Sequence, residues 1–168
     1  LANSLQELGI GHGDKVGLWL PNCAAYLEMF LACSQIGAIV VALNTKFKSH
    51  EMEDIVSRSG CKMLVLWPDF KNIPFLDILG GVTAEGLSNL EFVVCYSESF
   101  DVTPPKLPSC LDTKTILKFD TLLEGKSQFT SNVTPEDGLL VFTTSGTTGK
   151  PKFVLHTHYS VSYHATQI

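Results

Sequence analysis

The sequence predicts an α/β fold in which βαβ units form a mostly parallel sheet. Short apolar runs rich in β-branched residues alternate with segments of helical periodicity, and this alternation is the order that βαβ units produce. The strand candidates are continuously apolar, as expected for strands covered on both faces of a parallel sheet. Glycine or proline closes most of these segments and so separates helix from strand along the chain.

Each element has a local signal. Leu1, Leu5 and Leu8 lie at i, i+4 and i+7, which predicts one face of a short first helix that Gly9 ends. The other helices are expected over 22–36 with Asn22 as N-cap, over 49–60 with Ser49 as N-cap and Gly60 as C-cap, over 75–79, as a turn over 120–123, and from His158 onward. The strands are expected over 16–20, 38–43, 63–67, 92–96, 139–144 and 153–157.

Two segments fit this order less simply. Residues 23–43 are apolar and long enough to cross a membrane. Glu28 lies inside the run, and its character changes at Gly37 from helix formers to β-branched residues, so we expect a buried helix, a glycine C-cap and a buried strand. Residues 97–118 contain three prolines and are expected to form a surface loop or a small insert.

Composition limits the class of protein. The chain is 45% hydrophobic and 17% charged, which is typical of a globular domain. A net charge of −5 provides no basic surface and excludes nucleic acid as the main partner. The five cysteines include no CxxC pair. Their mostly apolar surroundings favour free thiols in a reducing compartment, which we take to be the cytoplasm.

Residues 143–152, Thr-Thr-Ser-Gly-Thr-Thr-Gly-Lys-Pro-Lys, carry the clearest chemical signal. The two glycines allow a tight turn that approaches a ligand closely, and successive backbone N–H groups in such a turn form an anion-binding nest. Hydroxyl donors and two lysines complete what a polyphosphate requires. The spacing is not that of a Walker A loop, because the glycines are three apart and Pro151 follows Lys150. On composition alone, a polar surface turn without a ligand remains an equal alternative.

The segment 144–149, followed by Pro151 and Lys152, is similar to the signature of the adenylate-forming (AMP-binding) superfamily. That superfamily includes acyl-CoA synthetases and the adenylation domains of peptide synthetases. Lys150 falls at the variable position of the signature, so Lys152 is the lysine that the resemblance makes a candidate catalytic residue. The nucleotide-binding set that the resemblance implies is Thr144, Ser145, Gly146, Thr147, Thr148, Gly149 and Lys152.

The resemblance extends beyond this loop, since residues 8–22, 37–44 and 51–62 resemble the family's opening elements in order and spacing. It implies the N-terminal subdomain of the adenylate-forming ligase fold. Phe153 departs from the pattern, because the family usually has glycine there. Phe153 either narrows the approach of the loop to phosphate or packs beneath it.

The chain opens on Leu1 within a helical pattern and ends without a stop signal. We therefore interpret residues 1–168 as a partial N-terminal AMP-binding domain. The rest of the large domain and a C-terminal domain are expected in the missing C-terminal part of the same chain. The fragment alone is expected to be inactive.

The resemblance implies an AMP-forming acid–thiol ligase of fatty acid metabolism. Such an enzyme uses ATP and Mg²⁺ to convert a carboxylic acid to an acyl-adenylate, and then transfers the acyl group to CoA. The expected partners are a small carboxylic acid, ATP and CoA, with no transmembrane span; contact with a membrane surface stays open. The alternatives are a nucleotide- or phosphate-binding module without catalysis, an adenylation domain that loads a carrier protein, and a structural domain. The sequence does not identify the acid.

His156 and His158 would share one face if both lay on a strand, and two such imidazoles can chelate a metal. No third ligand is evident near them in the sequence. An ordinary pair of histidines at a strand end is therefore the preferred interpretation, and no metal site is predicted.

Overall fold

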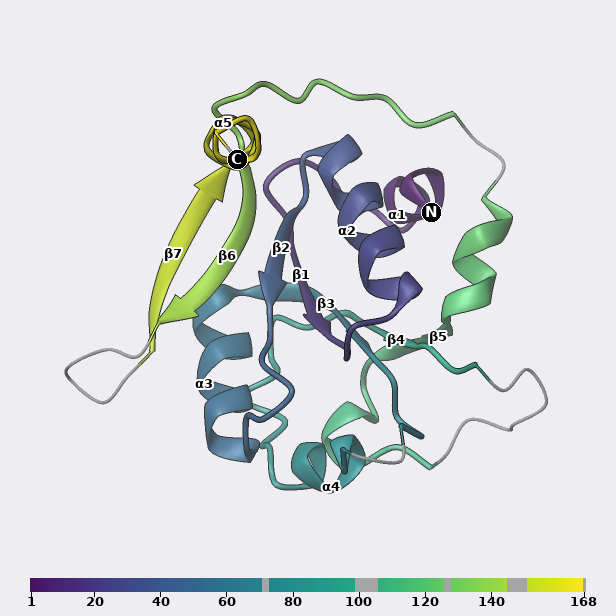
Figure 1. Cartoon of the computed structure of the whole chain (residues 1–168). Coiled ribbons are helices and arrows are strands. Elements are labelled where there is room, and N and C mark those ends of the chain that lie inside the picture. The colour runs from purple at the N-terminus through teal and green to yellow at the C-terminus, as the bar shows by residue number, and fades with distance from the viewer. Residues whose placement is uncertain (71–72, 99–105, 126–127, 145–150, 168) are drawn as a thin grey trace.

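The sheet of this computed structural model confirms the predicted parallel α/β architecture (Figure 1). The structure describes residues 1–70, 73–98, 106–125, 128–144 and 151–167. In these ranges the strands are β1 (Lys15–Trp19), β2 (Ile39–Ala42), β3 (Cys61–Leu66), β4 (Phe92–Cys95), β5 (Thr115–Lys118), β6 (Gly138–Thr144) and β7 (Lys152–Thr157). Their spatial order is β5-β4-β3-β1-β2-β6-β7. Neighbouring strands are parallel except for β6 and β7, which form an antiparallel hairpin.

Helices cover both faces of the parallel part of the sheet. They are α1 (Ala2–Glu7), α2 (Ala24–Ile36), α3 (Ser49–Ser59), α4 (Phe75–Gly80) and α5 (His158–Ala165), with short 3₁₀ helices η1 (Ser109–Leu111) and η2 (Phe119–Glu124). The chain moves one way across the sheet from β1 to β2 and the other way from β2 to β3. Right-handed crossovers therefore place α2 and α3 on opposite faces. Contacts agree with two layers, since α1 meets α2 and η2, whereas α4 meets α3 and η1.

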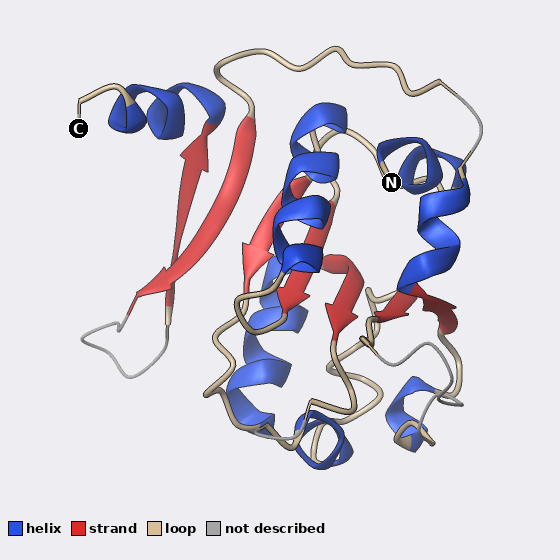
Figure 2. Ribbon diagram, turned by 45° about the vertical axis from the view of Figure 1, so that its right-hand side comes forward, coloured by secondary structure: helices blue, strands red, loops and turns tan. Residues whose placement is uncertain are grey.

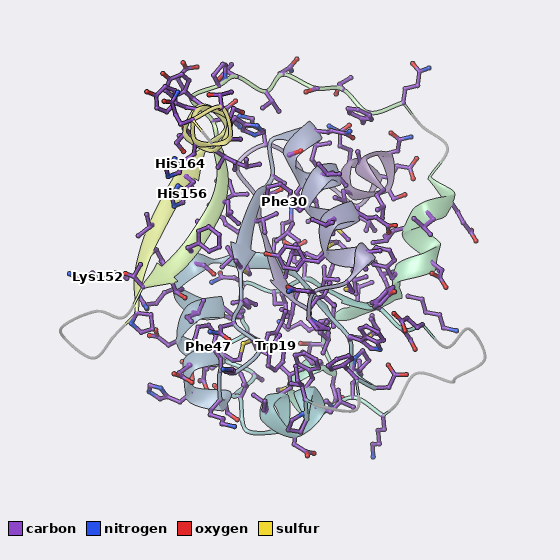
Figure 3. The ribbon with its side chains drawn as sticks, viewed as in Figure 1. Trp19, Phe30, Phe47, Lys152, His156 and His164 are labelled. Atoms are coloured by element: carbon purple, nitrogen blue, oxygen red, sulfur yellow. The ribbon has the colours of Figure 1, made fainter. Side chains whose placement is uncertain are left out.

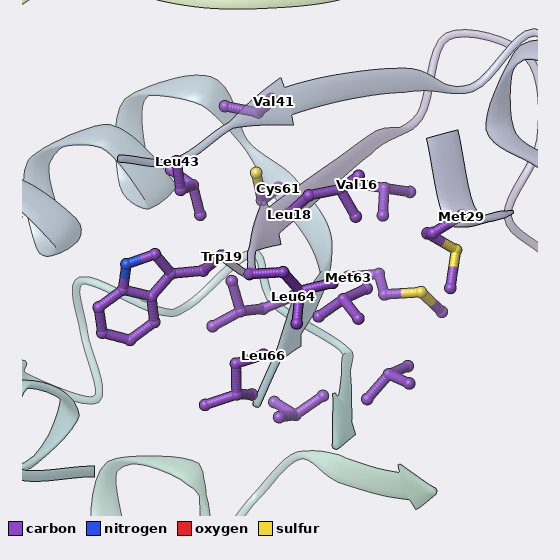
Figure 4. Packing of buried hydrophobic residues seen from close by; sticks show 14 of the residues in the cluster. Val16, Leu18, Trp19, Met29, Val41, Leu43, Cys61, Met63, Leu64 and Leu66 are labelled. Atoms are coloured by element: carbon purple, nitrogen blue, oxygen red, sulfur yellow. The ribbon is translucent and has the colours of Figure 1, made fainter. Parts of the chain in front are cut away.

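Burial on both faces distinguishes the central strands (Figure 4). Met63, Leu64, Val65 and Leu66 are consecutive in β3, and each is completely buried. Successive side chains of a strand point to opposite faces, so neither face of β3 meets solvent. Trp19 at the end of β1 is also fully buried, with its ring edge-on to Phe75 at a centroid separation of 4.5 Å. The apolar strand runs of the sequence thus correspond to a doubly covered parallel sheet.

Two of the helix starts predicted from the sequence were wrong by one residue. Cys23, not Asn22, is the N-cap of α2, with extended backbone at φ −147° and ψ 168°. Lys48 is the N-cap of α3, and its backbone N–H donates to the Glu51 carboxylate at 2.9 Å. Ser49 is instead the first residue of the helix, and its hydroxyl donates to the carbonyl of Ile78 at 2.6 Å. A tertiary hydrogen bond has displaced the local capping bond.

The prediction for 97–118 was incomplete. Within it, the described part contains η1 and the strand β5, which pairs in parallel with β4. Three of the four residues of β5 are exposed, because the strand lies at the edge of the sheet. It therefore lacks the continuous apolar run by which the other strands were recognised. The predicted turn over 120–123 is confirmed within η2.

The segment 23–43 forms α2, a glycine C-cap and β2, as predicted. No helix in the described ranges is long and apolar enough to cross a membrane. Gly37 has a left-handed backbone, with φ of 73°. A Cβ atom there would lie 2.6 Å from Cδ2 of His12. The left-handed backbone favours glycine at this position, and a Cβ atom would in addition require the exposed His12 ring to shift.

We predict that Gly37→Ala lowers the free energy of unfolding by about 1–2 kcal/mol, because alanine is strained in the left-handed region. Gly11→Ala is the matched control, since a Cβ atom at Gly11 meets nothing within 4 Å. Denaturant unfolding of both variants provides the measurement. Equal stabilities for the two variants would show that Gly37 is not conformationally required.

Candidate functional site

The predicted phosphate-binding loop joins the two strands of the β6–β7 hairpin. β6 runs parallel to β2, so its last residue, Thr144, lies at the carboxyl edge of the parallel sheet. Thr144 and Lys152 face each other as the final pair of the hairpin register. Ligands of open α/β sheets bind at this edge. The hairpin thus presents the ends of the predicted loop where a nucleotide site is expected.

Two residues of the predicted nucleotide-binding set fall within the described part of the chain. These are Thr144 and Lys152, and both side chains are exposed. In Figure 3, Lys152 lies near the tip of the hairpin and points away from the helix-covered sheet. The remaining members of the set, Ser145, Gly146, Thr147, Thr148 and Gly149, lie outside the described residues.

The hairpin extends beside the main body of the sheet (Figures 1 and 2), with α5 at the end opposite Thr144 and Lys152. Many of its apolar side chains are exposed, including Leu155 at 54% and Phe142 at 46%. No residue of α5 is buried. The hairpin therefore exposes more apolar side-chain surface than β1 and β3 do.

Phe153 packs against the hydrophobic core on the face of β7 opposite Lys152. The guanidinium carbon of Arg58, from α3, lies 4.6 Å from the centroid of the Phe153 ring. Phe153 thus packs against the core and Arg58, and the part of the prediction that concerns the loop itself falls on 145–150, outside the described residues. No sequence signal pointed to Arg58, because its partner on β7 is distant in the chain.

The turn before β6 is fixed by Asp137. Its carboxylate accepts a hydrogen bond from the backbone N–H of Thr134 at 2.7 Å and lies 3.1 Å from Nε2 of His12. Its carbonyl accepts from the backbone N–H of His158 at 3.0 Å. Asp137 therefore connects the start of the hairpin with the loop before β1 and the first residue of α5. The Thr134 N–H bond and then the His12 side chain lower the pKa of the Asp137 carboxyl.

The two histidines of the strand-end pair do not share a strand. β7 ends at Thr157, and His158 is the first residue of α5. Thr157 caps this helix, since its hydroxyl accepts from the Ser160 N–H at 3.1 Å while Ser160 Oγ accepts from the Thr157 N–H at 3.0 Å. His156 lies edge-on to Phe142 instead, with ring centroids 5.7 Å apart. Among the described residues, no group of three His, Cys, Asp or Glu side chains could hold a metal ion.

All five cysteines are free. Burial raises the pKa of the Cys33 thiol to about 12, and burial raises the pKa values of Cys61 and Cys95 to about 11. These thiols stay protonated at neutral pH and are poor nucleophiles. They contribute to packing and offer no covalent chemistry.

The family described as AMP-binding enzyme matches residues 1–168, and the chain belongs to that family. The chain is 30% identical over 175 residues to the mitochondrial medium-chain acyl-CoA ligase ACSF2 of Pongo abelii, covering 95% of this chain and 27% of the relative. It is 29% identical over 178 residues to an acetyl-coenzyme A synthetase of Gemmatimonas aurantiaca, covering 93% and 25%. The chain thus spans about a quarter of the length of these curated relatives.

Solved structures agree with the family assignment. The anthranilate CoA ligase AuaEII in complex with anthranoyl-AMP superposes with a TM-score of 0.77 and 25% identity, over 98% of this chain and 29% of that chain. The N-terminal domain of FACL13 from Mycobacterium tuberculosis gives a TM-score of 0.66 and 27% identity, over 96% and 35%. The fold is that of the N-terminal part of adenylate-forming ligases, as the sequence predicted.

The Asp137 contacts predict a pH-dependent contribution to stability. Because the pKa of Asp137 is lower in the folded state, the ionised carboxylate stabilises the fold at pH values above its ordinary pKa of 3.8. This contribution to stability is lost as the pH falls through the folded-state pKa. Asp137→Asn should therefore lower Tm at neutral pH, and the difference should shrink in acid. Glu136→Gln, at the exposed neighbouring residue, is the charge-matched control. A Tm difference for Asp137→Asn that does not change with pH would contradict the assignment.

Proposed function

We propose that the protein containing this chain activates a carboxylic acid with ATP and transfers the acyl group to the thiol of CoA. The observation that carries the proposal is the pairing of Thr144 and Lys152 at the carboxyl edge of the sheet, across the segment that bears the family signature. Family membership supports adenylate chemistry. Several relatives are named as ligases that use CoA, which favours CoA over a carrier protein as acceptor.

The chemistry explains the residue types in the loop. A carboxylate oxygen attacks the α-phosphorus of ATP, the bond from that phosphorus to the pyrophosphate oxygen breaks, and negative charge grows on the leaving pyrophosphate. Fixed donors and cations stabilise such developing charge. We assign that role to the backbone N–H groups and hydroxyls of 144–149 and to the ammonium of Lys152. The described residues offer no ligand cluster for Mg²⁺, so no step is assigned to the ion in this chain.

In this proposal, the chain is a partial N-terminal domain that turns over little or nothing by itself. We propose that the acid pocket and the remaining catalytic groups lie outside these residues, since the chain spans only about a quarter of the length of the curated relatives. The free cysteines support a reducing compartment, for which we propose the cytoplasm.

Carboxylate-dependent exchange between ATP and pyrophosphate in the full-length protein tests the proposal. We expect exchange with one class of acid in a panel of fatty and aromatic acids, and that class would identify the substrate. A folded protein that binds ATP without exchange for any acid would instead be a nucleotide-binding module.

Lys152→Ala in the full-length enzyme should lower the exchange rate at saturating ATP by about 10²-fold, because a charge that acts on the transition state is lost. Lys118→Ala is the control: it removes the same charge from an exposed position on β5, at the opposite edge of the sheet. An exchange rate for Lys152→Ala equal to that of the control would remove Lys152 from the catalytic site.

A further inference from the structure

Arg58 links α3 to the strand that carries Lys152. Its Nη2 donates to the carbonyl oxygen of Pro151 at 2.9 Å, and its guanidinium carbon lies 4.6 Å from the centroid of the Phe153 ring. Pro151 and Phe153 are the two neighbours of Lys152. One side chain from a distant helix therefore holds the backbone on one side of the candidate lysine and the aromatic ring on the other.

Asp54 fixes the guanidinium in this position. The Asp54 carboxylate accepts from Nε of Arg58 at 2.9 Å and from Nη2 at 2.6 Å. This two-point contact restricts the orientation of a planar guanidinium far more than a single contact would. Asp54 is one helical turn before Arg58, a spacing at which side chains of a helix meet. The pair is partly shielded, since the Arg58 side chain is 38% exposed and that of Asp54 is 17% exposed.

The helix that carries this pair is itself well anchored. Met52, Ile55 and Val56 bury its inner face, and Glu53 accepts from the hydroxyl of Thr83 at 2.5 Å. With the Ser49 hydrogen bond to α4, these contacts fix α3 against the core. Arg58 thus extends from a rigid element.

Apart from Arg58, few contacts hold β7 against the rest of the sheet. Among the described strands it pairs only with β6, because it lies at the edge of the sheet. Val154 and Leu155 are 39% and 54% exposed. The contact with Arg58 therefore contributes much to the position of the Lys152 end of the strand.

We propose that Arg58, oriented by Asp54, is a positioning residue that holds 151–153 so that Lys152 meets ATP in one geometry. The inference rests on the proposed function and adds to it a residue that the family signature does not contain. Phe153 then has a role of its own, because the ring that stands where the family usually has glycine is the surface on which Arg58 packs. Arg58 does not contact the nucleotide in this proposal.

Kinetics of ATP–pyrophosphate exchange in the full-length enzyme separate this role from that of Lys152. If Arg58 is lost, fewer molecules hold the binding-competent geometry, and apparent affinity falls in proportion. Arg58→Ala should therefore raise the KM for ATP by about tenfold, as expected for one cation–π contact and one hydrogen bond, and leave kcat within about twofold. Lys152→Ala should lower kcat instead. His50→Ala, at an exposed position of the same helix, should alter neither constant.

Conservative variants test the two contacts. Arg58→Lys keeps a cation above the ring but lacks the planar fork that Asp54 binds, so it should restore only part of the ATP affinity. Phe153→Leu removes the aromatic face and retains apolar bulk. In the double variant with Arg58→Ala, the increases in KM should combine to less than their product, because both changes remove one interaction.

Two further measurements do not require catalysis. Hydrogen exchange at the backbone amides of 152–157 should accelerate in Arg58→Ala, while the amides of β1 remain protected. Calorimetry should show the same loss of ATP affinity as the KM. An Arg58→Ala protein with unchanged amide exchange and unchanged ATP affinity would overturn the inference. If the wild type shows no ATP–pyrophosphate exchange with any acid, the proposed function is overturned. Amide hydrogen exchange and calorimetry of ATP binding would still decide the role of Arg58.

Discussion

Burial of the central strands on both faces is the constraint on which the rest of the structure depends. β3 buries four consecutive side chains completely, so helices must cover both faces, and only crossovers in two directions place them there. The carboxyl ends of the parallel strands then meet at one edge of the sheet. Thr144, the last residue of β6, lies at that edge. The position of the candidate site therefore follows from the burial of residues remote from it.

The β6–β7 hairpin, unlike the central strands, is buried only near its start. β6 contributes Leu139 and Leu140 to the core near its start, whereas Phe142 and Thr144 near its end are exposed. A strand that leaves the core in this way can present polar groups to a ligand, but it depends on side-chain contacts for its position. Asp137 fixes one end of the hairpin, and Arg58 reaches the other.

Much of the fold could be predicted from the sequence because its strongest signals are local. Gly37 closes α2 at the predicted place, and the apolar runs mark the buried strands. β5 was missed, since an exposed edge strand has no apolar run. The helix starts at Asn22 and Ser49 were wrong by one residue, and for Ser49 a bond to α4 competes with the local cap. At the candidate site, the signature predicts a role for Thr144 and Lys152, and that role stays a prediction. Arg58 and His12 could not be found from the sequence because their partners are far away in the chain.

We propose that the fold serves the transfer of an adenylyl group from ATP to a carboxylate. The most direct measurement is mass spectrometry of the products formed by the full-length protein with ATP labelled at the α-phosphate and a carboxylic acid, in the absence of CoA. The account predicts labelled acyl-adenylate together with pyrophosphate. Labelled ADP, or unchanged ATP in a protein that binds it, would contradict the account.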